Sequence, residues 1–310
     1  MDGLEEGIRT QLEESIAFHS LSLQDRLDSE VDGATRLIFR QGRSLFLESV
    51  ILRMNSGRTS LCVSCQIGCA AGCRFCATGQ MRQAVDLSTD EILDQLVQAN
   101  ALLKAEDRRI RNIVFMGMGE PFHNEAAVAE AIERLTDPSG FNHPPMKILV
   151  STVGVPDAMI RFAARFPKVN LALSLHSVDS KTRQKIIPIA RRLPLPEIRE
   201  ALSQVEVLRG GSPLMIEYLL LDGVNDSDAE IEALIDWLKG LNVHINLIPF
   251  NKSDSSDSLR PTPPPRQRAI GETLKARGFS CTLRYSLGAD IAAACGQLVT
   301  ATNRKILSKD

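Results

Sequence analysis

The segment Asn112-Ile113-Val114-Phe115-Met116-Gly117 is a short apolar run rich in branched side chains, and residues 124–135 behind it repeat apolar side chains with the period of a helix. Runs and helix-period segments of this kind alternate along most of the chain. Strands that alternate with helices predict parallel pairing through right-handed crossovers. Nearly continuous apolar strands are typical of a sheet that is covered on both faces. We therefore expect an α/β fold.

The number of these units limits the architecture. Apolar runs are found near 61–64 and at 112–117, 147–152, 169–175, 214–221 and 243–248. Helix-period segments lie at 89–105, 124–135, 156–165, 195–208, 227–240 and 265–277. About six βα units are too few for the usual eightfold barrel, so we predict a partial, open, TIM-like (β/α)6 barrel. Ligands in such folds bind at the carboxyl ends of the strands.

The segments that flank the barrel have other patterns. Residues 1–30 are acidic and amphipathic, which predicts a short helical segment, and residues 35–53 alternate apolar and polar side chains around Gln41-Gly42-Arg43, which indicates a hairpin. We expect an N-terminal helix-and-hairpin extension (1–55), a core domain (56–300) and a C-terminal tail (301–310). The polar, proline-rich stretch 251–265 predicts a long loop, and such loops are often functional.

Bulk composition excludes some classes of protein. The 310 residues carry a net charge of −2, and 44% are apolar, enough for a sizeable core. No run of about 18 apolar residues is present, and the acidic N-terminus has no signal pattern, so we expect a cytoplasmic protein without membrane association. The charge does not indicate a nucleic-acid partner, because phosphate-binding surfaces are usually basic.

Three cysteines carry the clearest chemical signal, in the run Cys69-Ala70-Ala71-Gly72-Cys73-Arg74-Phe75-Cys76. Thiolates at this spacing can hold an iron–sulfur cube and leave its fourth iron open to a small chelating molecule. A zinc knuckle is the alternative, with Cys62 or Cys65 as fourth ligand. The odd total of seven cysteines argues against a disulfide framework.

Polar residues follow several of the predicted strands. Gly117-Met118-Gly119-Glu120-Pro121 comes directly after the run 112–117; its glycines let the backbone approach a ligand, and Glu120 can accept hydrogen bonds from an ammonium. Alone, the segment is more typical of a turn that ends a strand. Beside a three-cysteine cluster it indicates a site for S-adenosylmethionine (SAM), whose ammonium and carboxylate chelate an open iron.

These residues also carry a family resemblance. The cysteine run with Ala77-Thr78-Gly79 resembles the radical SAM superfamily, and five further segments resemble the radical SAM RNA adenosine methyltransferases of the RlmN and Cfr group. The five segments, in the order of that group, are 62–69, 116–121, 170–176, 221–226 and 290–298. The resemblance covers about residues 48 to 305 and implies a barrel of the radical SAM type.

The resemblance implies a role for each matching residue. Cys69, Cys73 and Cys76 match the ligands of one 4Fe–4S cluster. Cys295 matches an S-methylcysteine intermediate, and Cys62 matches its resolving partner in a transient disulfide. Glu48 matches a proton acceptor, in an alignment that needs one extra residue before Cys62. The residues that match the SAM site are Gly119, Glu120, Ser151, Ser174, Leu175, His176 and Asn251.

The implied activity is methylation of C2 or C8 of an adenosine in 23S ribosomal RNA or in tRNA. These ring carbons are electron-poor, so the reaction is split by covalent catalysis: one SAM methylates Cys295, and a second SAM yields a 5′-deoxyadenosyl radical that activates the methyl group. The resemblance thus implies two SAM molecules per turnover, an external reductant such as flavodoxin or ferredoxin, and a monomer. It leaves the choice between C2 and C8 open.

Other interpretations stay open at this level. A radical SAM enzyme that acts on a peptide or small molecule is favoured by the short, weakly basic N-terminal region. A zinc-binding module without catalytic activity is the third hypothesis. Cys295 could be an inert buried thiol, and His176 a core histidine. The chain also departs from the group, which commonly has Ser where this sequence has Cys65, and its few aromatic residues leave Phe250 as one candidate for stacking on a base.

Overall fold

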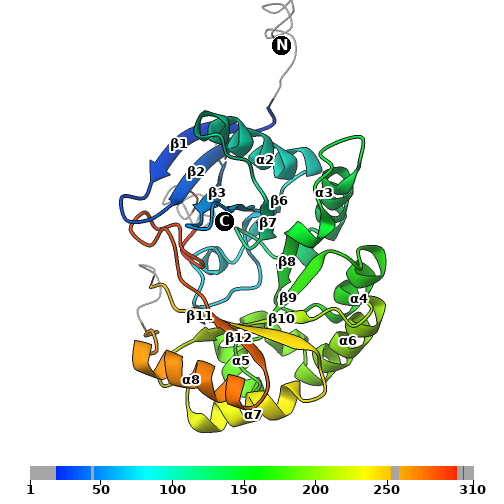
Figure 1. The fold of residues 1–310 in the computed structure, drawn as a ribbon, viewed down its shortest axis with the longest axis vertical. Helices are drawn as coiled ribbons and strands as arrows, with labels where there is room; N and C mark the ends of the chain where they lie inside the picture. The colour runs from blue at the N-terminus through cyan, green and yellow to red at the C-terminus, as the bar shows by residue number, and fades with distance from the viewer. Residues whose placement is uncertain (1–18, 43–44, 253–257, 299–302, 304–310) are drawn as a thin grey trace, which may run out of the picture.

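A ten-stranded sheet organises the protein (Figure 1). The computed structural model describes residues 19–42, 45–252, 258–298 and 303. The sheet order is β1-β2-β3-β4-β7-β8-β9-β10-β11-β12, and the strands from β4 onward are all parallel. The parallel strands are β4 (Thr59–Cys62), β7 (Asn112–Phe115), β8 (Ile148–Thr152), β9 (Asn170–Ser174), β10 (Leu214–Leu220), β11 (Val243–Pro249) and β12 (Ser280–Leu283).

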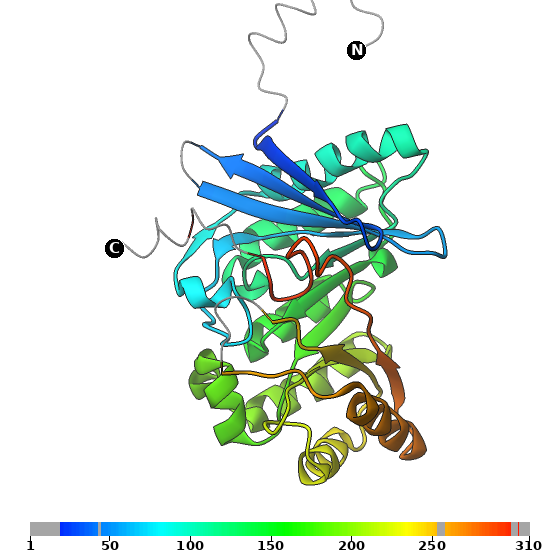
Figure 2. The same cartoon turned by 90° about the vertical axis from the view of Figure 1, so that its left-hand side faces the viewer.

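Helices follow the strands and cover the outside of the curved sheet (Figures 1 and 2). They are α2 (Thr89–Leu103), α3 (Glu125–Thr136), α4 (Pro156–Arg165), α5 (Ser180–Ile186), α6 (Leu195–Leu208), α7 (Asp228–Leu238) and α8 (Pro264–Ala276). Each of the six barrel strands β4, β7, β8, β9, β10 and β11 is followed by at least one helix, so the predicted six βα units and the partial, open barrel are confirmed. Within the described residues the sheet stays open, since β12 pairs with β11 alone.

Local sequence explains where these helices begin. Ser88 precedes α2 and accepts a hydrogen bond from the Glu91 backbone at 3.3 Å, while the Glu91 carboxylate accepts one from the Ser88 backbone at 2.8 Å. This reciprocal capping box satisfies two amides that the first turn leaves unpaired. α4 and α8 instead begin with proline, and α6 has a proline at its second position; proline has no amide hydrogen to satisfy.

Two elements of the barrel itself were not predicted. β12 follows α8 and is the last of the parallel strands. Its side chains are exposed or half-buried, so it lacks the apolar run by which the other strands were recognised. α5 lies between β9 and α6, and its polar seven residues show no helical apolar period.

The N-terminal extension adds three antiparallel strands, β1 (Ser22–Asp28), β2 (Ala34–Gln41) and β3 (Leu45–Arg53), and β3 pairs with β4. The predicted hairpin is confirmed as β2 and β3. The helical prediction for 1–30 is wrong over 22–28, which pair with β2 as an edge strand; residues 1–18 lie outside the described residues. Leu23 and Leu27 are four residues apart, which fits a helix, but pairing with β2 decided the local structure.

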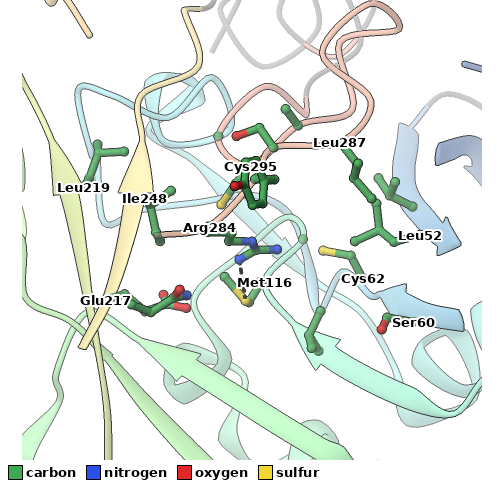
Figure 3. A pocket seen from close by; sticks show the side chains of 18 of the residues that line it. Leu52, Ser60, Cys62, Met116, Glu217, Leu219, Ile248, Arg284, Leu287 and Cys295 are labelled. Carbon is green, nitrogen blue, oxygen red and sulfur yellow. Dashed lines mark hydrogen bonds between the residues drawn. The ribbon is translucent and has the colours of Figure 1, made fainter. Parts of the chain in front are cut away.

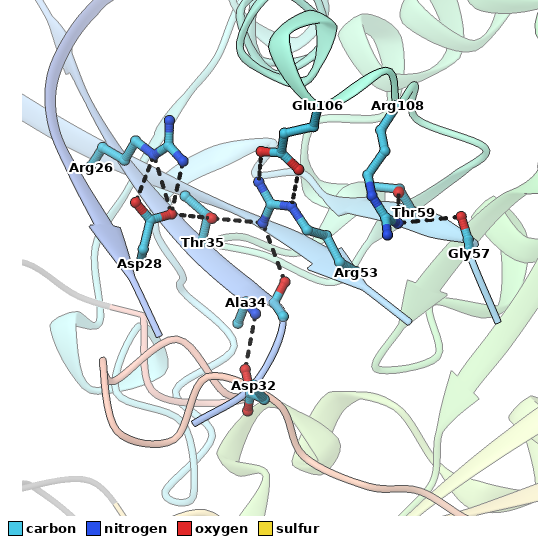
Figure 4. A network of polar contacts seen from close by, with 11 residues as sticks. Arg26, Asp28, Asp32, Ala34, Thr35, Arg53, Gly57, Thr59, Glu106 and Arg108 are labelled. Atoms are coloured by element: carbon cyan, nitrogen blue, oxygen red, sulfur yellow. Dashed lines mark hydrogen bonds and ion pairs between the residues drawn. The ribbon is translucent and has the colours of Figure 1, made fainter. Parts of the chain in front are cut away.

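Polar contacts tie this extension to the first βα unit (Figure 4). Arg53 of β3 donates two hydrogen bonds to the Glu106 carboxylate, at 2.6 and 2.7 Å, and one to Thr35 of β2 at 2.7 Å. Thr35 in turn donates to Asp28 of β1 at 2.6 Å. The guanidinium of Arg53 lowers the pKa of Glu106. The extension is therefore part of the same sheet as the barrel strands and is fixed to them by these polar contacts.

The structure describes only part of the segments for which the C-terminal tail and the long loop were predicted. Among the described helices, none is long and apolar enough to cross a bilayer. The boundaries at 55 and 300 stay predictions, and most of the tail 301–310 lies outside the described residues; Asn303 is described, and its side-chain oxygen accepts a hydrogen bond from the Phe46 backbone at 3.0 Å. Residues 253–257 of the predicted loop also lie outside the described part.

Candidate active site

A cavity of about 520 Å³ opens inside the curve of the parallel strands (Figure 3). Its walls come from the strands of the barrel, from the loop 69–83 and from the segment 284–298. Cavities of this size commonly hold cofactors or small ligands. Of the residues predicted from the sequence, those that line it are Cys62, Cys76, Ser174, His176, Phe250 and Cys295.

The cysteine run lies in the loop that joins β5 (Gln66–Gly68) to β6 (Ala84–Asp86). Cys69 and Cys73 are 8% and 7% exposed, and each is close enough to Cys76 for the negative charge of one thiolate to raise the pKa of the other. Burial is the largest cause and raises the pKa of Cys69 to about 12. Bare thiols at this place would be protonated, so the loop is suited to thiolates that a cationic group stabilises.

The three thiols fit an iron–sulfur cluster by their chemistry. They are soft donors, buried beside a cavity, and Cys76 borders that cavity while the others lie behind it. In the part of the chain that the structure describes, no three His, Cys, Asp or Glu side chains are grouped to hold a single metal ion. Cys62, one of the possible fourth ligands of a zinc knuckle, is placed opposite Cys295 instead.

Glu120 follows β7 and binds to the neighbouring strand ends. One carboxylate oxygen accepts hydrogen bonds from Thr152 Oγ1 at 2.7 Å and the Phe122 backbone at 3.1 Å, and the other accepts from the Val153 backbone at 2.8 Å. Burial raises the pKa of Glu120 and these hydrogen bonds oppose the rise. The carboxylate is 3% exposed and lies behind the cavity wall.

Position 119 accepts only a residue without a side chain. Its φ of +107° is a conformation that other residues rarely adopt, and an added Cβ would lie 2.7 Å from Gln66 Cβ and 2.9 Å from Cys65 Sγ. The backbone of this loop therefore packs directly against β5, and the loop places Glu120 beside β8.

Ser151 and Ser174 meet at a carboxylate that the sequence analysis did not single out. Ser151 Oγ donates to Glu217 Oε2 at 2.7 Å, and Ser174 Oγ donates to the same oxygen at 3.2 Å. Glu217 on β10 lines the cavity and is 2% exposed, and its Oε1 has no hydrogen-bond partner among the described residues. Burial raises the pKa of Glu217. An acidic residue within the apolar run 214–221 was the signal that could have identified it.

His176 is held in an unusual conformation at the end of β9. Its φ is +61°, its Nδ1 accepts a hydrogen bond from the Leu219 backbone at 3.0 Å, and its ring meets Phe75 edge-on at 4.9 Å. Burial, with a smaller effect of Arg183, lowers the pKa of His176 to about 3, so the imidazole is neutral. Leu175 beside it is fully buried, so its side chain belongs to the core and only its backbone is available.

Cys62 and Cys295 come from opposite ends of the chain and face one cavity (Figure 3). Cys62 ends β4, and Cys295 lies on a loop that is joined to the cysteine run by a hydrogen bond from Ala77 N to Gly296 O at 2.7 Å. Asn251 donates to Cys295 O at 3.2 Å, so it holds this loop and does not border the cavity. The two cysteines are free thiols.

Arg284 lies between the two thiols and Glu217 in Figure 3, where its Nη1 donates to Met116 Sδ at 3.7 Å. Burial raises the pKa of Cys62, which is half-buried, to about 12. Desolvation in the cavity raises the pKa of the Cys295 thiol to about 11, although Cys295 is exposed, so it is not an inert buried thiol. Arg284 opposes both shifts, since its positive charge favours the thiolate. The site therefore holds two thiols that are protonated at neutral pH, with a cation placed to stabilise whichever loses its proton.

Known proteins match both this architecture and this sequence. Residues 63–238 match the model of the radical SAM superfamily. The chain is 54% identical over 292 residues to a probable RNA methyltransferase of Rhodopirellula baltica, covering 94% of this chain and 77% of that protein. It is also 37% identical over 306 residues to a probable dual-specificity RNA methyltransferase RlmN of Thermus thermophilus, covering 99% and 85%. The chain belongs to the radical SAM superfamily, in the RlmN-like group of RNA methyltransferases.

Solved structures agree. The crystal structure of a radical SAM methyltransferase from Sphaerobacter thermophilus has a TM-score of 0.90 and 37% identity, covering 96% of this chain and 86% of that one. Streptococcus suis SuiB, with a TM-score of 0.52 and 11% identity, shares the fold alone.

In this RlmN-like protein Glu48 lies behind the cavity and does not border it. It is fully buried on β3 and forms a two-point ion pair with Arg36, with nitrogen–oxygen distances of 3.0 and 2.9 Å. Arg36 also donates to Ile291 O at 3.1 Å, which connects Glu48 to the loop that carries Cys295. The pair therefore fixes the position of this loop against the hairpin.

Cys65, where the RlmN-like group commonly has Ser, is a core residue here. It is 2% exposed, its Sγ donates weakly to Met118 O at 3.7 Å, and it packs against Gly119. Phe250, the predicted stacking residue, is 5% exposed and borders the cavity.

Proposed function

We propose that this protein methylates C2 or C8 of an adenosine in ribosomal RNA or tRNA, through an S-methyl group carried on Cys295. The observation that supports this proposal most strongly is the meeting of Cys295 and Cys62 in one cavity that Cys76 also borders. Such a pair has no use in a radical SAM enzyme that only abstracts hydrogen. It suits a reaction that first loads a methyl group on one sulfur and later releases a covalent adduct with the other.

Cys69, Cys73 and Cys76 would hold a 4Fe–4S cluster, and SAM would occupy the adjoining carboxyl edge of the sheet. When bound, the cluster and SAM supply a one-electron cleavage that yields the 5′-deoxyadenosyl radical, with the electron from a reductant such as flavodoxin or ferredoxin. The residues proposed to hold SAM are Gly119, Glu120, Ser151, Ser174, Leu175, His176 and Asn251. Two SAM molecules would be used in each turnover.

Cys295 acts as the nucleophile in the loading step. Its thiol must lose a proton before it can accept a methyl group, and its partly desolvated surroundings make that loss unfavourable by raising its pKa to about 11, although the residue itself is exposed. The guanidinium of Arg284 offsets part of this cost. The thiolate supplies the electron pair for the new bond between sulfur and the methyl carbon. The bond between that carbon and the sulfonium sulfur of SAM breaks, and S-adenosylhomocysteine leaves with its electron pair.

Cys62 acts in the release step. Its thiolate attacks the sulfur of Cys295 and breaks the bond between that sulfur and the carbon attached to RNA. The electron pair of that bond stays with the product carbon, which takes up a proton, and the two sulfurs form a disulfide. A thiol reductant then restores both cysteines. Before this release the ring adduct, formed by radical addition, must lose one proton and one electron. Glu48 is the proposed acceptor of the proton and must first separate from Arg36, and the oxidised cluster would take up the electron.

The substrate base must leave its stack to reach this site. RNA bases are accessible to enzymes when they are unpaired or splayed from a loop. The cavity offers the rings of Phe75 and Phe250 on its wall, and aromatic rings of this kind stack on a base. We further propose that the protein acts as a cytoplasmic monomer.

The test uses reconstituted enzyme, methyl-labelled SAM, a reductant and RNA. Label is expected first on Cys295 and then in RNA as 2-methyl- or 8-methyladenosine, identified by mass spectrometry of nucleosides. Cys295→Ala should abolish both signals, and Cys62→Ala should trap protein on RNA. Cys281→Ala is the matched control, because that thiol does not line the cavity.

RNA methylation by the Cys295→Ala enzyme would overturn the proposal. Release of deoxyadenosine with a peptide or small molecule, and no RNA methylation, would favour the alternative enzyme class.

A further inference from the structure

Arg183 on α5 is the largest of the fully buried side chains in the described part of the protein, at 1% exposed. Its Nε donates to Leu175 O at 3.1 Å and its Nη2 to Val153 O at 2.6 Å. Its Nη1 has no partner among the described residues. Leu175 and Val153 follow β9 and β8, so the guanidinium lies at the carboxyl edge of the sheet, where the proposed cofactor site is.

The charge of this arginine is not balanced by a carboxylate. Within the described ranges Arg183 takes part in no ion pair, and the one charged group that favours its protonated form is the thiolate of Cys73. Glu120 is near but is kept apart by the Val153 peptide, whose N–H donates to Glu120 and whose carbonyl accepts from Arg183. A buried cation without a counter-ion is strongly unfavourable, so Arg183 is placed to face an anion.

The backbone fixes α5 against the cysteine run. Arg74 N donates to Ile186 O, the last residue of α5, at 2.9 Å, and Ile189 N donates to Ala71 O at 3.4 Å. These two bonds flank Cys73 in the sequence. The backbone that carries Arg183 therefore cannot move away from the cysteine loop without breaking these contacts.

We propose that Arg183 is the fixed counter-charge of the cluster bound by Cys69, Cys73 and Cys76, and that it raises the reduction potential of that cluster. Three thiolates outweigh the positive charge of the iron–sulfur core, so the assembly is an anion, and reduction makes it more negative. A nearby fixed cation stabilises the reduced form more than the oxidised form, and a buried site screens this effect weakly. Arginine suits the role because its guanidinium stays charged at neutral pH.

This inference rests on the cluster of the proposed function but not on RNA as the substrate. A second source of negative charge is the carboxylate of SAM. The two sources can be distinguished, because the cluster is present in enzyme without SAM and the carboxylate is not.

The test compares Arg183→Met and Arg183→Lys with wild type and with Arg209→Met. Arg209 is the matched control: it is also buried and has an unpartnered Nε, but it ends α6 at the opposite edge of the sheet. Each enzyme is reconstituted without oxygen, its iron per chain is measured, and its potential is determined by dithionite titration with electron paramagnetic resonance detection, first without SAM and then with it.

Arg183→Met is expected to retain iron and to disfavour reduction at least tenfold without SAM, a shift of about 59 mV to more negative potential. Arg183→Lys and Arg209→Met should stay closer to wild type. If Arg183→Met loses its iron while Arg183→Lys keeps it, the proposal is also supported.

An unchanged potential in iron-loaded Arg183→Met would overturn the inference, and so would loss of iron from both Arg183 variants. A shift that occurs only with SAM bound would assign Arg183 to the SAM carboxylate and also overturn it. A shifted potential without RNA methylation would leave this inference standing and count against the proposed substrate. Iron-free wild-type protein would count against both.

Discussion

Replacing Asn225 by alanine is expected to destabilise the fold and weaken SAM binding together. Asn225 is fully buried after β10, and its Nδ2 donates to His176 O and to Leu219 O, each at 2.6 Å. Its Oδ1 accepts from the Leu221 backbone at 2.8 Å. One side chain therefore satisfies three buried backbone groups and holds His176 in its left-handed conformation.

The magnitude follows from these three hydrogen bonds. A typical bond contributes about 1 kcal/mol net, and a buried group left without a partner costs about 1–3 kcal/mol. Loss of all three should lower the free energy of unfolding by about 3–5 kcal/mol. Tyr218→Phe gives an internal scale, because it removes only the hydrogen bond from the Tyr218 hydroxyl to Asn225 O, at 2.9 Å, and should cost about 1 kcal/mol.

Urea unfolding followed by circular dichroism measures the first effect, and equilibrium dialysis of labelled SAM against iron-loaded enzyme measures the second. We expect SAM affinity to fall roughly tenfold in Asn225→Ala, which corresponds to about 1.4 kcal/mol, and to stay near wild type in Tyr218→Phe. The reasoning is refuted if Asn225→Ala unfolds within about 1 kcal/mol of wild type, or if it is destabilised as expected while SAM affinity is unchanged.

Two further predictions concern the same edge of the sheet. Gly119→Ala should lower the free energy of unfolding by about 2–5 kcal/mol through backbone strain and overpacking, while Gly210→Ala, also at positive φ but with open space around an added Cβ, should cost less; equal urea midpoints would contradict this. The pKa of His176 is lowered in the folded protein, so its contribution to stability is present above about pH 6.5 and is lost as pH falls. Between pH 7 and pH 5 the free energy of unfolding of wild type should therefore fall by about 2 kcal/mol more than that of His176→Gln. Parallel curves of unfolding free energy against pH for the two proteins would exclude this cause.

The parts of the fold that were predicted correctly have local signals. An apolar run such as 112–117 and the helix period behind it are properties of neighbouring residues, so six βα units could be counted from the sequence. The strand 22–28 and β12 have no such signal, because their side chains are largely exposed and pairing with a neighbouring strand decides their conformation. The polar α5 was missed for a similar reason.

The site divides in the same way. Residues such as Cys76 and Ser174 could be chosen from motifs and strand ends, while Glu217, Arg284 and Arg183 could not, since their roles depend on which strands and helices are adjacent. Glu48 is the opposite case. Its match to the family could be found from the sequence, but only the packing shows that it pairs with Arg36 and lies behind the cavity wall.

The sequence by itself determined the spacing of the three cysteines and the order of the barrel units, because both depend on neighbouring residues along the chain. Only the tertiary structure decided that Cys62 and Cys295 face one cavity near Arg284, and that Arg183 is buried beside the cysteine loop without a carboxylate partner. Such contacts join segments far apart in the chain. Their energies depend on burial and on the distance between charges, and neither quantity can be obtained from residue order alone.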